Sequence, residues 1–128
     1  MFDYGNKIKN ANKLIKFFGE FPSFHDSEIV EVKLDRRLPS LEIKIYTFLM
    51  QNEVDKKGHY KRDKECIVVI KFSSIENLQI EDFNRQNVIS NIDFAQKGNC
   101  VQVNINPCYG FAAQFACKTI EIVSIKAK

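Results

Sequence analysis

The chain has 128 residues, enough for one domain built around one hydrophobic core. Hydrophobic residues make up 45% of it and charged residues 27%, which argues against an intrinsically disordered chain. A net charge of +3 does not by itself indicate binding to nucleic acid or membrane, and no apolar run has the length of a membrane span. We therefore expect one soluble, cytoplasmic domain that covers residues 1–128.

The first predicted element is one amphipathic helix near the N-terminus. Its apolar residues recur at intervals of three and four: Ile8, Ala11, Leu14, Ile15 and Phe18. Asn6 is positioned to cap the first turn, and Gly19 to end the helix in the left-handed conformation.

Beyond residue 26 the apolar period changes from helical to two, which predicts strands. One set is Val30, Val32 and Leu34, and after the turn "RRLPS" a second set is Leu41, Ile43 and Ile45. These two strands should be antiparallel neighbours. The β-branched run "CIVVIKF", residues 66–72, predicts a strand buried on both faces. Residues 51–65, "QNEVDKKGHYKRDKE", have no apolar period and predict a charged hairpin loop.

The last third of the chain predicts a short helical turn near residues 84–88, a strand containing Ile92 and Phe94, and then a hairpin. The first hairpin strand has Val101, Val103 and Ile105 on one face, and "NPCYG" turns the chain. In the returning strand the apolar residues fall at odd positions as far as Cys117 and at even positions from Ile120, so a regular strand could not bury both sets. We therefore predict a β-bulge near Lys118 or Thr119.

Together these elements predict an α+β domain: a curved antiparallel sheet of about six or seven strands with one N-terminal helix packed on it. The alternative is a small β-sandwich closed by the helix. Parallel winding is disfavoured, because no helical segments separate the predicted strands.

Polar residues cluster where the helix gives way to the first strand: His25, Asp26, Ser27 and Glu28. A His-Asp pair can supply two metal ligands, but the chain has only one other histidine, His59, so the ligand set is incomplete. Ser27 lacks the sequence context of a nucleophile. We interpret the cluster mainly as a turn in which Asp26 or Ser27 accepts backbone N–H bonds, and we expect no catalytic residues, cofactor or metal.

The four cysteines contain no CxxC pair and have no histidine next to them in sequence. We expect them to be free thiols, mostly buried as small hydrophobes, with Cys108 in "NPCYG" the most exposed. The charged loop carries basic residues around Tyr60, interrupted by acidic ones. It is typical of a solvated loop, and the alternative is a nucleic-acid-binding module that uses residues 56–64.

The order of four segments carries a family resemblance: "FPSFHDSEIVEVKLDR", "LEIKIYTF", "IVVIKFSSIENLQIEDFNRQNVI" and "VQVNINPCYGFAAQFACKTIEIV". Between about Phe21 and Val123 the chain resembles the immunity protein 50 family of bacterial polymorphic toxin systems. The resemblance implies a non-enzymatic protein that binds and neutralises a cognate toxin domain.

For such binding we expect charged and aromatic loop residues to be used: His25, Asp26, Glu28, Lys57, Tyr60, Lys61 and Arg62. The absence of Trp and the slightly basic balance depart from many immunity proteins against basic nucleases, which are acidic.

Overall fold

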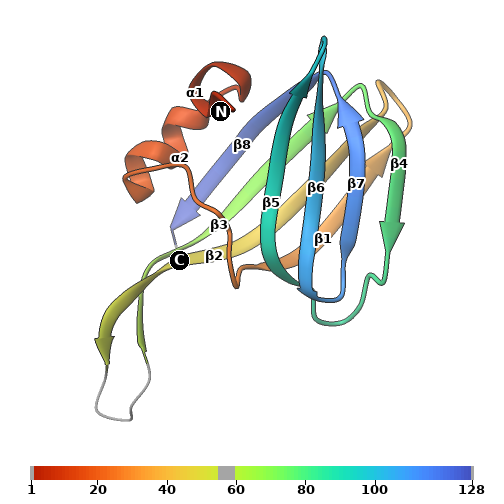
Figure 1. The fold of residues 1–128 in the computed structure, drawn as a ribbon. Coiled ribbons are helices and arrows are strands. Elements are labelled where there is room, and N and C mark those ends of the chain that lie inside the picture. Colours follow the sequence, from red (N-terminus) through yellow and green to blue (C-terminus); the bar gives the residue numbers. More distant parts are fainter. Residues whose placement is uncertain (1, 55–59, 128) are drawn as a thin grey trace.

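The computed structural model describes residues 2–54 and 60–127, and describes side chains over 2–48 and 64–127. Two short helices precede eight strands in this part of the chain (Figure 1). The elements are α1 (Tyr4–Lys7), α2 (Ala11–Phe18), β1 (Glu28–Asp35), β2 (Ser40–Val54), β3 (Tyr60–Ser73), β4 (Glu76–Glu81), β5 (Val88–Lys97), β6 (Cys100–Tyr109), β7 (Ala112–Cys117) and β8 (Thr119–Ala127). The predicted α+β class is confirmed, with one strand more than the upper estimate.

All eight strands form one antiparallel sheet in the order β4-β7-β6-β5-β1-β2-β3-β8. Its weakest join is between β1 and β5, where one residue pair, Glu28 with Val88, is in register. The amide of Ile89 donates to Ser27 O and that of Ile29 to Asn87 O, each at 2.8 Å. We call this join the seam.

The sheet folds over at the seam, so that two halves of it face each other. Strands β4 to β7 form the front half in Figure 1, and β1, β2, β3 and β8 form the back half. The rings of Phe72 on β3 and Phe115 on β7 meet edge to face with centroids 5.0 Å apart. The hydrophobic core therefore lies between the halves, and α2 adds buried side chains to it.

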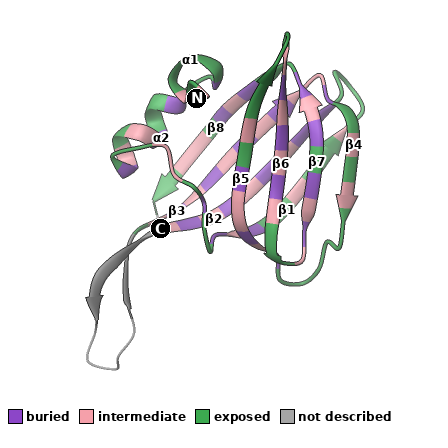
Figure 2. Ribbon diagram, in the orientation of Figure 1, coloured by how far each residue is buried: buried purple, intermediate pink, exposed green. Residues whose placement is uncertain are grey.

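Alternate residues of the core strands are buried (Figure 2), as the period of two predicts. The predicted inward residues of β2 and β6 are all buried: Leu41, Ile43, Ile45, Val101, Val103 and Ile105. In β3, by contrast, Val68 and Ile70 are buried but Ile67 and Val69 between them are only partly covered. The prediction that this strand is buried on both faces is wrong, because the opposing half of the sheet covers one face.

Strand β1 does not keep a strict alternation. The register with β2 shifts between Ile29 and Glu31, so Ile29 and Val32 pair with inward-facing residues of β2 and the intervening Val30 is 48% exposed. Leu34 pairs with buried Leu41 and is still 58% exposed. The predicted set therefore holds only for Val32, which packs against the core, whereas Val30 is displaced by the bulge and Leu34 is exposed.

The predicted single N-terminal helix is divided in two. Asp3, rather than Asn6, caps the first turn, because its carboxylate accepts the Asn6 amide. The chain then leaves the helical conformation: Lys9 pairs with β8 through bonds of 2.8 and 2.9 Å, and Asn10 has φ 65°. Gly19 ends α2 with φ 91°, as predicted.

The predicted long final strand is also two strands. β7 lies in the front half and β8 in the back half, and the chain crosses at Lys118, whose amide donates to Ser73 O at 3.1 Å. The buried residues change from odd to even positions because the core lies on the other side of the chain after the crossing. The predicted β-bulge at Lys118 or Thr119 is therefore not required.

Two predicted loop structures also differ. No helical turn forms at residues 84–88; instead the buried Asn87 side chain accepts the amides of Asn84 and Phe111. Residues 51–65, predicted as a hairpin loop, instead extend β2 and β3, which stay paired as far as Val54 with Tyr60. Backbone pairing of this kind does not require an apolar face, so the sequence pattern did not reveal it.

Candidate functional site

The chain enters β1 through a tight turn at residues 23–27. The Ser27 amide donates to Phe24 O at 3.0 Å, and Ser23 Oγ accepts the His25 amide at 3.3 Å. Phe24 and Asp26 each have φ 63°, in the left-handed region that costs non-glycine residues of order 1–3 kcal/mol. This backbone buries the Phe24 side chain and leaves His25 and Asp26 exposed.

The His25 ring has two polar neighbours. Its Nδ1 lies 2.9 Å from Ser90 O on β5, and its Nε2 lies 3.5 Å from Asp26 Oδ1. A carbonyl oxygen only accepts, so Nδ1 carries the proton of this hydrogen bond. The side chains of His25 and Asp26 are 62% and 50% exposed, and Glu28 is half-buried at the start of β1. The structure therefore places His25 and Asp26 against each other beside the seam, and Glu28 in the residue pair that forms it.

Ser27 has a structural role rather than a catalytic one. It is 1% exposed, and its Oγ is 2.6 Å from Thr47 Oγ1, which is equally buried. The hydroxyl thus pairs across to β2 and not with the His25 ring. Ser27 does accept a backbone N–H bond where the strand begins, as predicted, but through its carbonyl, to which the Ile89 amide donates at 2.8 Å. Within the turn, the side chain that accepts a backbone amide is that of Ser23.

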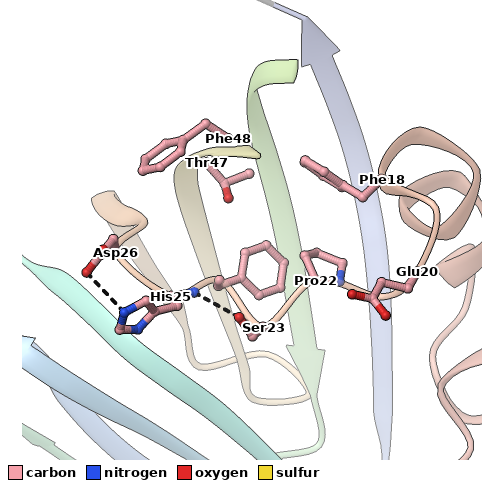
Figure 3. A pocket seen from close by; sticks show the side chains of 9 residues that line it. Phe18, Glu20, Pro22, Ser23, His25, Asp26, Thr47 and Phe48 are labelled. Atoms are coloured by element: carbon pink, nitrogen blue, oxygen red, sulfur yellow. Dashed lines mark hydrogen bonds and ion pairs between the residues drawn. The ribbon is translucent and has the colours of Figure 1, made fainter. Parts of the chain in front are cut away.

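A cleft of about 310 Å³ runs along this turn. Figure 3 shows His25 and Asp26 at one end of it and Phe18 and Glu20 at the other. Its lining is Phe18, Glu20, Pro22, Ser23, Phe24, His25, Asp26, Thr47 and Phe48. The hydroxyl of Ser23 accepts the His25 backbone amide and that of Ser27 pairs with Thr47, so neither is bonded to the His25 ring. Among its described residues the cleft therefore lacks an activated hydroxyl nucleophile.

Two residues of β6 join the predicted cluster. Cys108 places its sulfur within 4.8 Å of a ring nitrogen of His25 and a carboxylate oxygen of Asp26. Tyr109, 58% exposed, pairs with Val88, which pairs in turn with Glu28. We define the seam surface as His25, Asp26, Glu28, Cys108 and Tyr109. Sequence reasoning predicted the exposure of Cys108 but not its proximity to His25.

The cysteines otherwise agree with expectation. All four are free; Cys66 and Cys117 are buried and Cys100 is half-buried. Burial raises the pKa of the Cys66 thiol, and burial together with nearby Cys100 raises the pKa of Cys117 to about 12.

The basic hairpin residues were the other predicted contact. Lys57 lies outside the described residues, and for Tyr60, Lys61 and Arg62 the structure describes the β3 backbone without the side chains. Lys64, further along β3, donates to Phe17 O in the last turn of α2 at 2.7 Å. Nucleic-acid binding through residues 56–64 stays a prediction.

These features define a small α+β domain with an exposed polar surface at the join of its two sheet halves. A protein-family model described as Immunity protein 50 matches residues 10–128. The chain therefore belongs to this family of immunity proteins of polymorphic toxin systems, as its sequence resemblance indicated.

Among solved structures, the chain is similar to that titled "Crystal structure of an uncharacterized protein from Neisseria gonorrhoeae". The identity is 15%, the TM-score 0.50, and the match covers 79% of this chain and 93% of that one, a likeness of fold. Comparison with curated proteins found no match. Neither helix of the described residues has the length and apolarity to cross a membrane.

Proposed function

We propose that this protein binds a cognate toxin domain and blocks it by occupying its surface, without catalysing a reaction. The observation that carries this proposal is the family match over residues 10–128. Blocking by contact requires only a complementary surface, about 800 Å² on each partner for an interface of standard size.

The seam surface is the proposed contact. His25 and Tyr109 present exposed rings, the kind of side chain that anchors protein interfaces. Asp26 in the turn and Glu28 at the start of β1 add two carboxylates, suited to a basic group on the toxin. Lys57, Tyr60, Lys61 and Arg62 are proposed as a second contact, since the end of β2 and the start of β3, where Tyr60, Lys61 and Arg62 lie, extend away from the body of the sheet (Figure 1).

The test begins with the toxin domain, identified as a protein that copurifies from the native host or is encoded beside this chain. Co-expression with that domain in a sensitive bacterium should restore growth. In binding measurements, Asp26→Lys/Glu28→Lys should weaken the complex by at least about tenfold, because like charges facing each other across an interface cost several kcal/mol.

The matched control is Glu76→Lys/Glu81→Lys, the same charge change at two exposed residues of β4 in the front half. It should bind the toxin as the unaltered protein does. An equal loss in both variants would remove the seam surface from the proposal. A toxin domain that neither binds nor is neutralised by this chain would refute the proposed function itself.

A further inference from the structure

Three side chains with different metal-binding atoms converge at the seam. A ring nitrogen of His25, a carboxylate oxygen of Asp26 and Cys108 Sγ all lie within 4.8 Å of one another. The first two residues come from the turn before β1, and Cys108 comes from β6. Sequence alone showed only two of these ligands, and the fold supplies the third.

The His25 ring is arranged as a metal ligand is. Its Nδ1–H donates to Ser90 O at 2.9 Å, and a backbone carbonyl is a common outer partner of metal-bound histidine because it fixes the tautomer. In the neutral ring the lone pair is then on Nε2, which faces Asp26 Oδ1 at 3.5 Å. Two acceptors that face each other at this distance are stabilised by a cation between them.

The spacing is close to that of a zinc site. Ligand atoms of a tetrahedral Zn²⁺ ion lie about 3.3–3.8 Å apart, given typical ion-to-ligand distances. The 3.5 Å between Nε2 and Oδ1 already meets this requirement. Cys108 Sγ, which lies within 4.8 Å of a ring nitrogen of His25 and a carboxylate oxygen of Asp26, must move closer to both to complete the geometry.

That approach has little to oppose it. Cys108 is exposed, and the hydrogen bond from its Sγ to Ile89 O is long, at 3.8 Å. The Asp26 carboxylate is held near by the left-handed backbone at that residue and by the bond from its amide to Ile89 O at 2.9 Å.

We infer that His25, Asp26 and Cys108 form a binding site for Zn²⁺, with three protein ligands and a fourth position open to water. The combination of imidazole, thiolate and carboxylate selects zinc over magnesium or calcium, which prefer oxygen ligands alone. Bound zinc links the turn before β1 to β6 and so clamps the seam, where β1 and β5 share only one residue pair in register.

The test uses the whole protein freed of metal by a chelator. One equivalent of Zn²⁺ should bind in competition with a chromophoric chelator and should raise the unfolding temperature. Co²⁺ should give a sulfur-to-cobalt charge-transfer band, which requires the Cys108 thiolate. Cys108→Ser should abolish that band and weaken zinc binding by more than about 100-fold, beyond the effect usual for outer partners.

Cys100→Ser, at the other end of β6, is the matched control and should keep both the band and the affinity. Asp26→Asn should weaken zinc binding and keep the charge-transfer band. Circular dichroism and unfolding in chelator should show that each variant folds as the unaltered protein does. Absence of the charge-transfer band in the unaltered protein, or equal zinc affinity in the Cys108→Ser variant, would overturn the assignment.

Discussion

Asp35, the last residue of β1, has a carboxylate that is held by Arg37 two residues later. Arg37 donates to it from its backbone amide at 2.9 Å and from its guanidinium at 2.9 and 3.3 Å. The guanidinium hydrogen bond is the largest cause, followed by the backbone bond, and together they lower the pKa of Asp35 from 3.8 to about 2. The charged form is therefore favoured more in the folded protein than in the unfolded one.

This gives a prediction with a defined sign. A lowered pKa in the folded state stabilises the protein above pH 4 and ceases to do so as pH falls towards 2. Arg37→Ala should raise the pKa of Asp35 part of the way back, because the backbone hydrogen bond remains. An NMR titration of the Asp35 side-chain carbons would measure it, and Arg36→Ala should leave the value unchanged. If the pKa of Asp35 in the Arg37→Ala variant equalled that in the unaltered protein, the guanidinium would not be the main cause of the lowered pKa.

The turn that joins β6 to β7 shows how one element is fitted to another. Gly110 has φ 82°, and a Cβ there would lie 2.5 Å from Gln86 O and 2.7 Å from Asn87 Oδ1. The Asn87 side chain bonds the Asn84 backbone on one side and the Phe111 amide on the other. The turn and the loop before β5 are therefore packed too closely to admit a side chain at Gly110.

Gly110→Ala should lower the free energy of unfolding by about 3 kcal/mol, the sum of a left-handed alanine and a steric clash with the backbone. Gly98→Ala is the control, since Gly98 has φ 60° and a Cβ at that position would have nothing within 4 Å. It should cost only about 1–2 kcal/mol. Urea unfolding would measure both, and equal losses would show that the contact with residues 86–87 is unimportant.

Element by element, the sequence predicted a strand well where one face is buried by a single opposing layer. The alternations in β2 and β6 were predicted correctly for this reason. The errors lie where tertiary pairing changes the local pattern: the bulge at Val30, the division of the helix where Lys9 pairs with β8, and the crossing at Lys118. The alternation of apolar residues along a strand tells which of them are buried, but not which layer of the protein buries them.

The same limit applies to the candidate site. His25 and Asp26 are adjacent in sequence, so their grouping could be seen without a structure. The approach of Cys108 depends on the seam and on two register shifts between β5 and β6, near Val88 and Ile89. No local pattern encodes such shifts, and for this reason the third ligand could not be predicted.

For the molecule as a whole, the two halves of the sheet shield two thiols from opposite sides. Cys66 belongs to β3 in the back half and Cys117 to β7 in the front half, and both are fully buried. In buffer that contains a chelator, an aromatic disulfide reagent should modify Cys108 rapidly. Cys66 and Cys117 should react only as fast as the halves separate, because burial also raises their pKa values.

Stopped-flow absorbance would resolve these phases, and Cys108→Ser should remove the fast one. The slow phase should accelerate in urea in parallel with global unfolding. Rapid modification of Cys117 in the native protein would contradict the packing of the two halves.

The pairing of β3 with β8 has a consequence for how the protein is made. On the ribosome β3 emerges before any part of the front half, and β8 is translated only after all four strands of that half. During this interval the hydrogen-bonding groups along one border of β3 have no strand to meet, beside a run rich in isoleucine and valine. Newly synthesised chains are thus open to intermolecular strand addition until β8 arrives, and expression at a low level, which keeps the concentration of incomplete chains low, should increase the fraction of soluble protein.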